Sequence, residues 1–118
     1  MWIRSSPIVL ISLLAVQQAT AQQPQPQPSV QIMAQAYDRC MATYAVRLTH
    51  TAAPDADIFM QASQACLPLK EQLRAAIQTQ LPPPQAAQIL QSIDAQAEPN
   101  FMTMLTRIRS DRARRAGQ

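Results

Sequence analysis

Apolar residues recur at intervals of three and four along most of this chain, which is the spacing of one face of an α-helix. The first apolar stripe begins after Ser29, a residue type that caps helices well, and ends near Thr49. It consists of Val30, Met33, Tyr37, Cys40, Tyr44 and Leu48. A second stripe consists of Ile58, Ala62, Cys66, Leu69, Leu73 and Ile77. The pattern therefore predicts two helices, which the turn around Pro54 folds into an antiparallel hairpin.

Prolines mark where the predicted helices begin, bend or end. Pro54 fits the first turn of the second helix, because that turn does not need its N–H. Pro68 lies inside the second stripe, where it removes a backbone hydrogen bond and crowds the preceding turn. We therefore expect a kink there, or two helices that meet at Leu67. The run LPPP ends this element, and Pro84 can begin a third helix whose inward residues are Ala86, Ile89, Ile93 and Ala97.

The last predicted helix follows the pair Glu98-Pro99, which indicates another break or kink. Its inward residues are Phe101, Met104, Leu105 and Ile108. Glycine occurs once, at Gly117, whereas tight β-hairpins usually need glycine in their turns. No sustained alternation of apolar and polar residues indicates a strand. The sequence therefore predicts an all-α fold, with a small bundle of three to four helices over residues 30–110.

The first 21 residues have the features of a secretory signal peptide. Arg4 supplies positive charge, residues 8–16 form an apolar stretch, and the sequence ATA at 19–21 matches the small-residue pattern at which signal peptidases cut. A membrane-spanning helix needs roughly 20 apolar residues, so this stretch is too short for an anchor. We expect cleavage after residue 21 and a secreted or periplasmic mature chain without a transmembrane helix. Residues 22–29 then form a solvated Pro/Gln-rich leader.

The composition indicates a thin hydrophobic core and a modest charge. Of the 118 residues, 47% are hydrophobic but only 4% are aromatic, so small and aliphatic side chains must supply the buried area, at about 25 cal/mol per Å2. Removal of residues 1–21 takes Arg4 away and leaves nine basic against seven acidic residues, a formal charge of +2. The pI of about 9.4 therefore overstates the basic character of the mature chain. A thin core in an oxidising compartment is where a disulfide stabilises most.

The two cysteines of the chain are placed symmetrically about the predicted turn. Cys40 and Cys66 each lie 13 residues from Ala53, and at 1.5 Å per residue each helical arm is roughly 20 Å long. Antiparallel arms of equal length bring both cysteines, which belong to the apolar stripes, to the same height. Small neighbours allow the Cα separation of about 5.5 Å that a disulfide needs, and these are Ala36, Ala62 and Ala65. We therefore predict a Cys40–Cys66 disulfide across the hairpin.

Other chemistry fits these residues less well. A structural zinc site needs four Cys or His ligands, whereas this chain has two cysteines and one histidine, His50, on the turn. A redox pair is usually Cys-x-x-Cys, and a cysteine nucleophile needs a histidine beside it. None of the seven carboxylates is spaced for acid/base work, and no Gly-rich phosphate loop or Gly-x-Ser-x-Gly motif occurs. We therefore expect no enzyme, and no catalytic, cofactor-binding or metal site.

Two further residue types could carry a function. Five arginines near the C-terminus could contact an anionic surface, and they are Arg107, Arg109, Arg112, Arg114 and Arg115. They also suit a solvated basic tail over residues 111–118 that complements the helix dipole, and they lack the interleaved aromatic residues of a nucleic-acid binder.

Thioethers bind Cu(I), so Met102 and Met104 suggest copper handling. The competing interpretation is core filling, because Met33, Met60 and Met104 lie on or beside apolar stripes.

The segment LPPPQAAQI resembles the Leu-Thr-x-x-Gln motif of all-helical periplasmic stress and metal-resistance proteins. Leu81 and Gln85 hold the matching positions, while Pro82 replaces the threonine. The plan of a signal peptide, an all-α domain and one disulfide is similar to that of small periplasmic acid-stress chaperones.

Our leading hypothesis is a non-enzymatic envelope protein that binds another macromolecule, as a chaperone-like protein or an adaptor. The alternative is a periplasmic protein of metal-stress sensing or sequestration.

Overall fold

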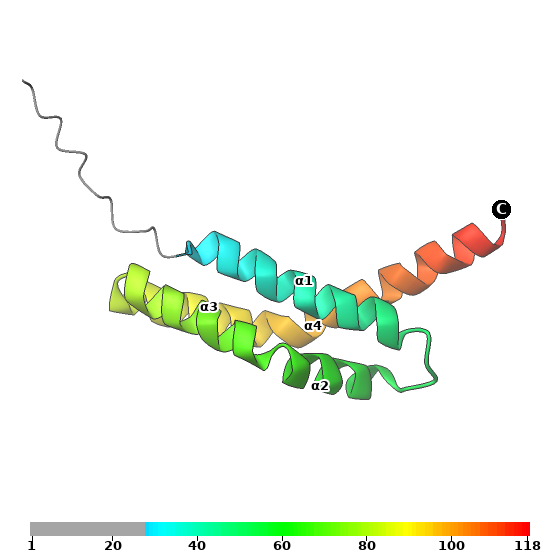
Figure 1. Cartoon of the computed structure of the whole chain (residues 1–118), viewed down its shortest axis with the longest axis horizontal. Helices are drawn as coiled ribbons and strands as arrows, with labels where there is room; N and C mark the ends of the chain where they lie inside the picture. Colours follow the sequence, from blue (N-terminus) through cyan, green and yellow to red (C-terminus); the bar gives the residue numbers. More distant parts are fainter. Residues whose placement is uncertain (1–27) are drawn as a thin grey trace, which may run out of the picture.

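The computed structural model describes residues 28–118, and these residues form four helices (Figure 1). The helices are α1 (Val30–Leu48), α2 (Asp55–Ala65), α3 (Leu67–Gln80) and α4 (Pro83–Ala116). No strand occurs between residues 28 and 118, and the predicted all-α fold is confirmed. The predicted signal peptide over 1–21, and residues 22–27 of the predicted leader, lie outside the described residues.

The helices form a bundle of three rods, of which the second along the chain is divided into α2 and α3. Figure 1 shows α1 and the first part of α4 running in the same direction, while α2 and α3 run in the opposite direction and lie beside both of them. Each helix contacts the other three. The short turn at residues 81–82 joins α3 to α4, so α4 lies along both α3 and α1. This arrangement gives α1 and α4 a shared side, on which the candidate site is found.

The division between α2 and α3 lies at Cys66, which ends the first helix and precedes the second. Pro68 is in the first turn of α3, where its missing N–H is not needed. The amide of Lys70 restores the helical pattern by donating to the carbonyl oxygen of Cys66 at 3.1 Å. Of the two outcomes expected for Pro68, the structure has two helices that meet at Leu67.

Two details of the predicted helices differ in the structure. Pro54 is the N-cap of α2 and precedes its first turn, and Pro83 begins the last helix in place of Pro84. Each difference amounts to one residue.

The predicted third and fourth helices are a single 34-residue helix, α4, with Pro99 inside it. Proline costs one backbone hydrogen bond at this point, but Phe101 and Leu105 beyond it are buried in the core, and their packing outweighs that loss. Figure 1 shows the second part of α4 turning away from the direction of its first part. The helix also continues through the basic segment to Ala116, so residues 111–116 are helical.

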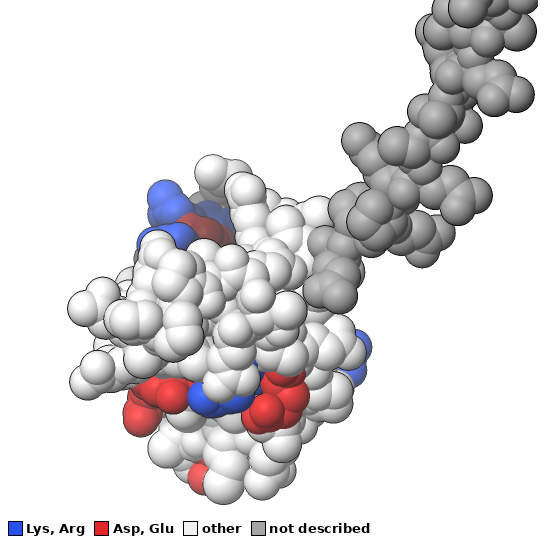
Figure 2. Space-filling view, turned by 90° about the vertical axis from the view of Figure 1, so that its left-hand side faces the viewer, with Lys and Arg blue, Asp and Glu red and all other residues white. Residues whose placement is uncertain are grey.

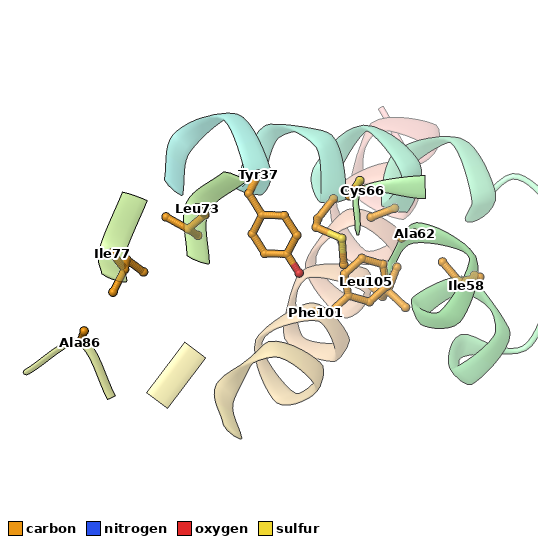
Figure 3. Close-up of a cluster of buried hydrophobic side chains, with 11 residues drawn as sticks. Tyr37, Ile58, Ala62, Cys66, Leu73, Ile77, Ala86, Phe101 and Leu105 are labelled. Atoms are coloured by element: carbon orange, nitrogen blue, oxygen red, sulfur yellow. The ribbon is translucent and has the colours of Figure 1, made fainter. Parts of the chain in front are cut away.

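The buried core contains residues from every helix (Figure 3). Its members are Tyr37, Met41, Ala45, Ile58, Ala62, Cys66, Leu73, Ile77, Ala86, Phe101 and Leu105. On α1 the buried line is rotated by one position from the predicted stripe, because this helix packs against α4 as well as against α2 and α3. Met41 is therefore only 6% exposed, whereas Met60, which the sequence placed beside an apolar stripe, is 52% exposed.

Candidate functional site

The predicted disulfide is present and joins α1 to the junction of α2 and α3. Cys40 and Cys66 are bonded with their Cα atoms 5.9 Å apart, which is within the ordinary range for disulfides. Cys66 is fully buried, and Cys40 packs against the edge of the same core. Both cysteines of the chain are used in this bond, so neither offers a free thiol for nucleophilic or metal chemistry in this state.

Three of the five predicted contact arginines bind other parts of the chain. Arg109 forms an ion pair with Asp55 at the N-terminus of α2, with the two side chains 2.7 Å apart. This hydrogen bond lowers the pKa of the Asp55 carboxyl and raises the pKa of the Arg109 guanidinium. Arg114 pairs with Asp111 one turn earlier on the same helix. An anionic surface would therefore compete with existing partners at these positions.

Arg112 reaches the C-terminal end of α1. Its guanidinium donates to the carbonyl oxygen of Thr49 at 3.2 Å and to the Thr49 hydroxyl at 2.9 Å. It also lies 3.5 Å from the carbonyl oxygen of Val46 and 3.2 Å from Nε2 of His50. The last carbonyl groups of a helix have no partner within the helix, so this arginine caps α1 and attaches α4 to it. His50 thus belongs to this contact and not to a site around the cysteines.

We expect Arg112→Ala to lower the free energy of unfolding by about 1–2 kcal/mol, because it removes charged hydrogen bonds to α1 that are partly shielded from water. Arg115→Ala is the matched control: this side chain is exposed and makes no hydrogen bond or ion pair within residues 28–118, so its effect should stay within about 0.5 kcal/mol. Urea denaturation followed by circular dichroism measures both. Equal effects of the two substitutions would contradict the capping role.

A groove runs between α1 and α4 and has a volume of about 530 Å³. Its floor includes Leu73 of α3 and the aromatic rings of Tyr37 and Phe101. Figure 3 shows the Tyr37 ring extending from α1 toward α4. Side chains from both helices line the walls, and these include Ala34, Asp38, Met41, Ala42, Ser92, Ile93, Gln96, Ala97, Asn100, Met104 and Arg107. The volume is within the range of ordinary ligand sites.

The groove is mainly apolar but carries one charge of each sign. Asp38 is on the α1 wall and Arg107 is on the α4 wall, and neither forms an ion pair with another residue between 28 and 118. Partial burial raises the pKa of the Asp38 carboxyl, because water is removed from its charged form. Burial is also the main reason that the pKa of the Tyr37 hydroxyl is raised. The groove can therefore bind an apolar group that also carries charges to meet these two.

Comparison with known proteins finds no matching family model, no matching curated protein and no matching solved structure. Within the described part of the chain, no group of three or more His, Cys, Asp or Glu side chains is placed to hold a metal ion. No helix between residues 28 and 118 is long and apolar enough to cross a membrane.

The other charged cluster of the bundle lies between α3 and α4 and is internally paired. Asp94 accepts from Lys70 at 3.0 Å and lies 3.8 Å from Arg74, which is also 3.8 Å from Glu71. Figure 2, viewed toward the end where α3 turns into α4, shows basic and acidic side chains beside one another on a largely uncharged surface. These residues hold two helices together and leave little charge unpaired, so we do not treat them as a binding site.

The sequence pattern did not reveal the groove, because small residues create it. Ala34 and Ala42 on α1 and Ala97 on α4 leave space that larger side chains would fill. In the sequence alone, an alanine within a helical stretch indicates only high helix propensity. A signal was nevertheless present: Ala34, Asp38 and Ala42 are spaced by four and therefore share one face of α1.

Proposed function

We propose that this protein is a non-enzymatic protein of the cell envelope or the extracellular space that binds a segment of another protein in the groove between α1 and α4. The observation that carries the proposal is the groove itself, which combines an apolar floor with small side chains along its walls. The role is that of an adaptor or a chaperone-like protein, because the groove supplies a binding surface without a catalytic constellation.

The residues of the groove suit a protein segment as ligand. Met41 and Met104 face it from opposite helices, and methionine side chains adapt their shape to different apolar partners. The half-open walls are formed by two helices that run side by side, which is the arrangement that binds an apolar helix face in many peptide-recognition proteins. Gln96 and Asn100 add amide groups along one wall, and these can hydrogen-bond to polar groups at the edge of a bound segment.

The disulfide supports placement of this activity outside the cytoplasm. Structural disulfides persist in oxidising compartments such as the periplasm and the extracellular space, and the Cys40–Cys66 bond connects two helices of the bundle. The predicted signal peptide over residues 1–21 points to the same compartments. For the alternative of metal-stress sensing, residues 28–118 contain no group of three or more His, Cys, Asp or Glu side chains that could hold a metal ion.

A photo-cross-linking residue at Ala97 tests the proposal, with Ala87 as the matched control position. Both are alanines of α4, but Ala97 lines the groove and Ala87 is exposed outside it. After cross-linking in the native envelope, the captured protein is identified and purified, and its affinity for the chain is measured by calorimetry. Ala97→Arg should weaken binding at least tenfold, because it fills the groove, and Ala87→Arg should leave binding unchanged. Equal cross-linking at both positions, or an affinity insensitive to Ala97→Arg, would reject the proposal.

A further inference from the structure

We propose that the segment bound in the groove is a single amphipathic helix that runs antiparallel to α1 and α4. It places an acidic residue against Arg107 and, later in its sequence, a basic residue against Asp38. This inference rests on the proposed function, since it names the class of partner for the same groove. It is carried by three features of the bundle: the direction of the helices, the small residues along the groove, and the positions of the two charges.

The direction of the bound helix follows from the directions of its neighbours. The helices α1 and α4 run in the same general direction and opposite to α3, although α4 changes direction in its second part (Figure 1). A helix laid in the groove contacts α1 and α4 and completes a four-helix bundle in which α3 is diagonally opposite. Bundles of this kind usually have antiparallel neighbours, and antiparallel neighbours also place the helix dipoles favourably. The bound helix therefore begins near Arg107 and proceeds toward Asp38.

The walls of the groove allow a helix to approach closely. Packed helices lie about 8–10 Å apart, with the smaller separations at small side chains. Ala42 on α1 and Ser92 and Ala97 on α4 provide such positions. Beneath them, Phe101 is only 2% exposed and forms a firm floor, and its ring packs against Phe59 with centroids 5.3 Å apart. The bound helix must therefore present an apolar stripe to this floor.

The two charges of the groove are offset along its length. Arg112 bonds to Thr49, and this contact sets the register of α4 on α1. Arg107 precedes Arg112 by five residues and Asp38 precedes Thr49 by eleven, so at 1.5 Å per residue the two charges are offset by roughly 9 Å. This offset corresponds to about six residues of the bound helix. Since the charges lie on opposite walls, their partners flank the apolar stripe on opposite sides.

Charge complementarity favours a helix over an anionic membrane surface as the occupant. A membrane of anionic lipids would attract Arg107 but repel Asp38, which faces the same groove. Partial burial already disfavours the charged form of the Asp38 carboxyl. A cation that approaches this carboxylate therefore stabilises its charged form, and an anion destabilises it further. A helix with one residue of each sign satisfies both walls. It also carries its acid toward its N-terminus and its base toward its C-terminus, as its own dipole prefers.

Two synthetic peptides of about 18 residues test the inference. Both have the same composition and apolar stripe, but one carries glutamate six residues before lysine and the other has these two residues exchanged. Binding of each dye-labelled peptide to the oxidised chain is measured by fluorescence anisotropy. The acid-first peptide should bind about fivefold more tightly, as two partly exposed ion pairs permit, and the difference should shrink as salt is added. Equal affinities at low salt would overturn the inference.

Variants of the chain distinguish failure of this inference from failure of the proposed function. The double variant Asp38→Arg/Arg107→Asp changes two exposed residues and should reverse the preference between the peptides, while Ala97→Arg should abolish binding of both. If both peptides bind equally but Ala97→Arg abolishes binding, the inferred orientation of the bound helix is wrong, whereas the proposal that the groove binds a protein segment is retained. If neither peptide binds, or if the chain sediments with anionic vesicles instead, the inference is wrong. If Ala97→Arg has no effect on peptide or partner binding, the proposed function fails as well.

Discussion

Replacing Cys40 and Cys66 together with alanine is expected to lower the free energy of unfolding by about 3.5 kcal/mol. The bond closes a loop with a sequence separation of 26 residues, and opening it restores conformational freedom to the unfolded chain. Alanine is the appropriate replacement because Cys66 is fully buried, and serine would add the cost of a buried hydroxyl. The expected loss is a large share of the roughly 5–15 kcal/mol that stabilises an ordinary domain.

The thin core explains why this loss matters so much. Three of the eleven buried hydrophobic residues in the described part of the chain are alanines, namely Ala45, Ala62 and Ala86, and each buries little area. Urea denaturation of the oxidised chain, the reduced chain and the double variant measures the effect, with reduction as the control for the substitution. The reduced chain and the variant should lose similar stability. A loss below about 1 kcal/mol in both would show that packing alone holds the hairpin.

Leu105→Ala is expected to cost about 2–5 kcal/mol of unfolding free energy, as large-to-small substitutions in a closed core do. The Leu105 side chain is fully buried and lies beyond Pro99 on α4, where it belongs to the packing that keeps this helix continuous. Shortening it leaves a cavity that its neighbours cannot fill without moving α4. Because α4 forms one wall of the groove, the same variant should also weaken binding there.

Leu67→Ala is the matched control for this substitution. It makes the same chemical change at a leucine that is 48% exposed, so only a fraction of the burial energy is lost, and we expect a cost below about 1 kcal/mol. Both variants are compared by chemical denaturation, with helix content checked by circular dichroism. Similar costs for the two leucines would mean that α4 does not pack on the core as the structure has it.

The sequence was sufficient to predict the disulfide and an interruption of the second helix at Pro68, either as a kink or as two helices. Cys40 and Cys66 are equally distant from the turn. Their contact therefore depends only on the rise per residue of two helices, which is the same in every regular α-helix. Pro68 likewise acts on its own turn through its missing N–H and its ring. Features that depend on a residue and its near neighbours are thus accessible before the packing of the bundle is known.

The continuous α4 and the groove could not be predicted because they depend on how helices pack together. Pro99 has the same local chemistry as Pro68, but buried residues on both of its sides keep α4 helical across it. The capping contact of Arg112 joins residues 63 positions apart, and no local sequence pattern predicts such a pair. The groove depends on how α4 is positioned along α1, and this position follows from the packing of the whole bundle.

The central claim is that a helix binds between α1 and α4, and amide NMR of the isotope-labelled, oxidised chain tests it most directly. On titration with the acid-first peptide, the account predicts shifts concentrated at groove residues such as Asp38, Ala42 and Ala97. The exposed positions Ile32 and Met60, outside the groove, should change little. Shifts centred on those outer positions, with the groove residues unchanged, would contradict the account.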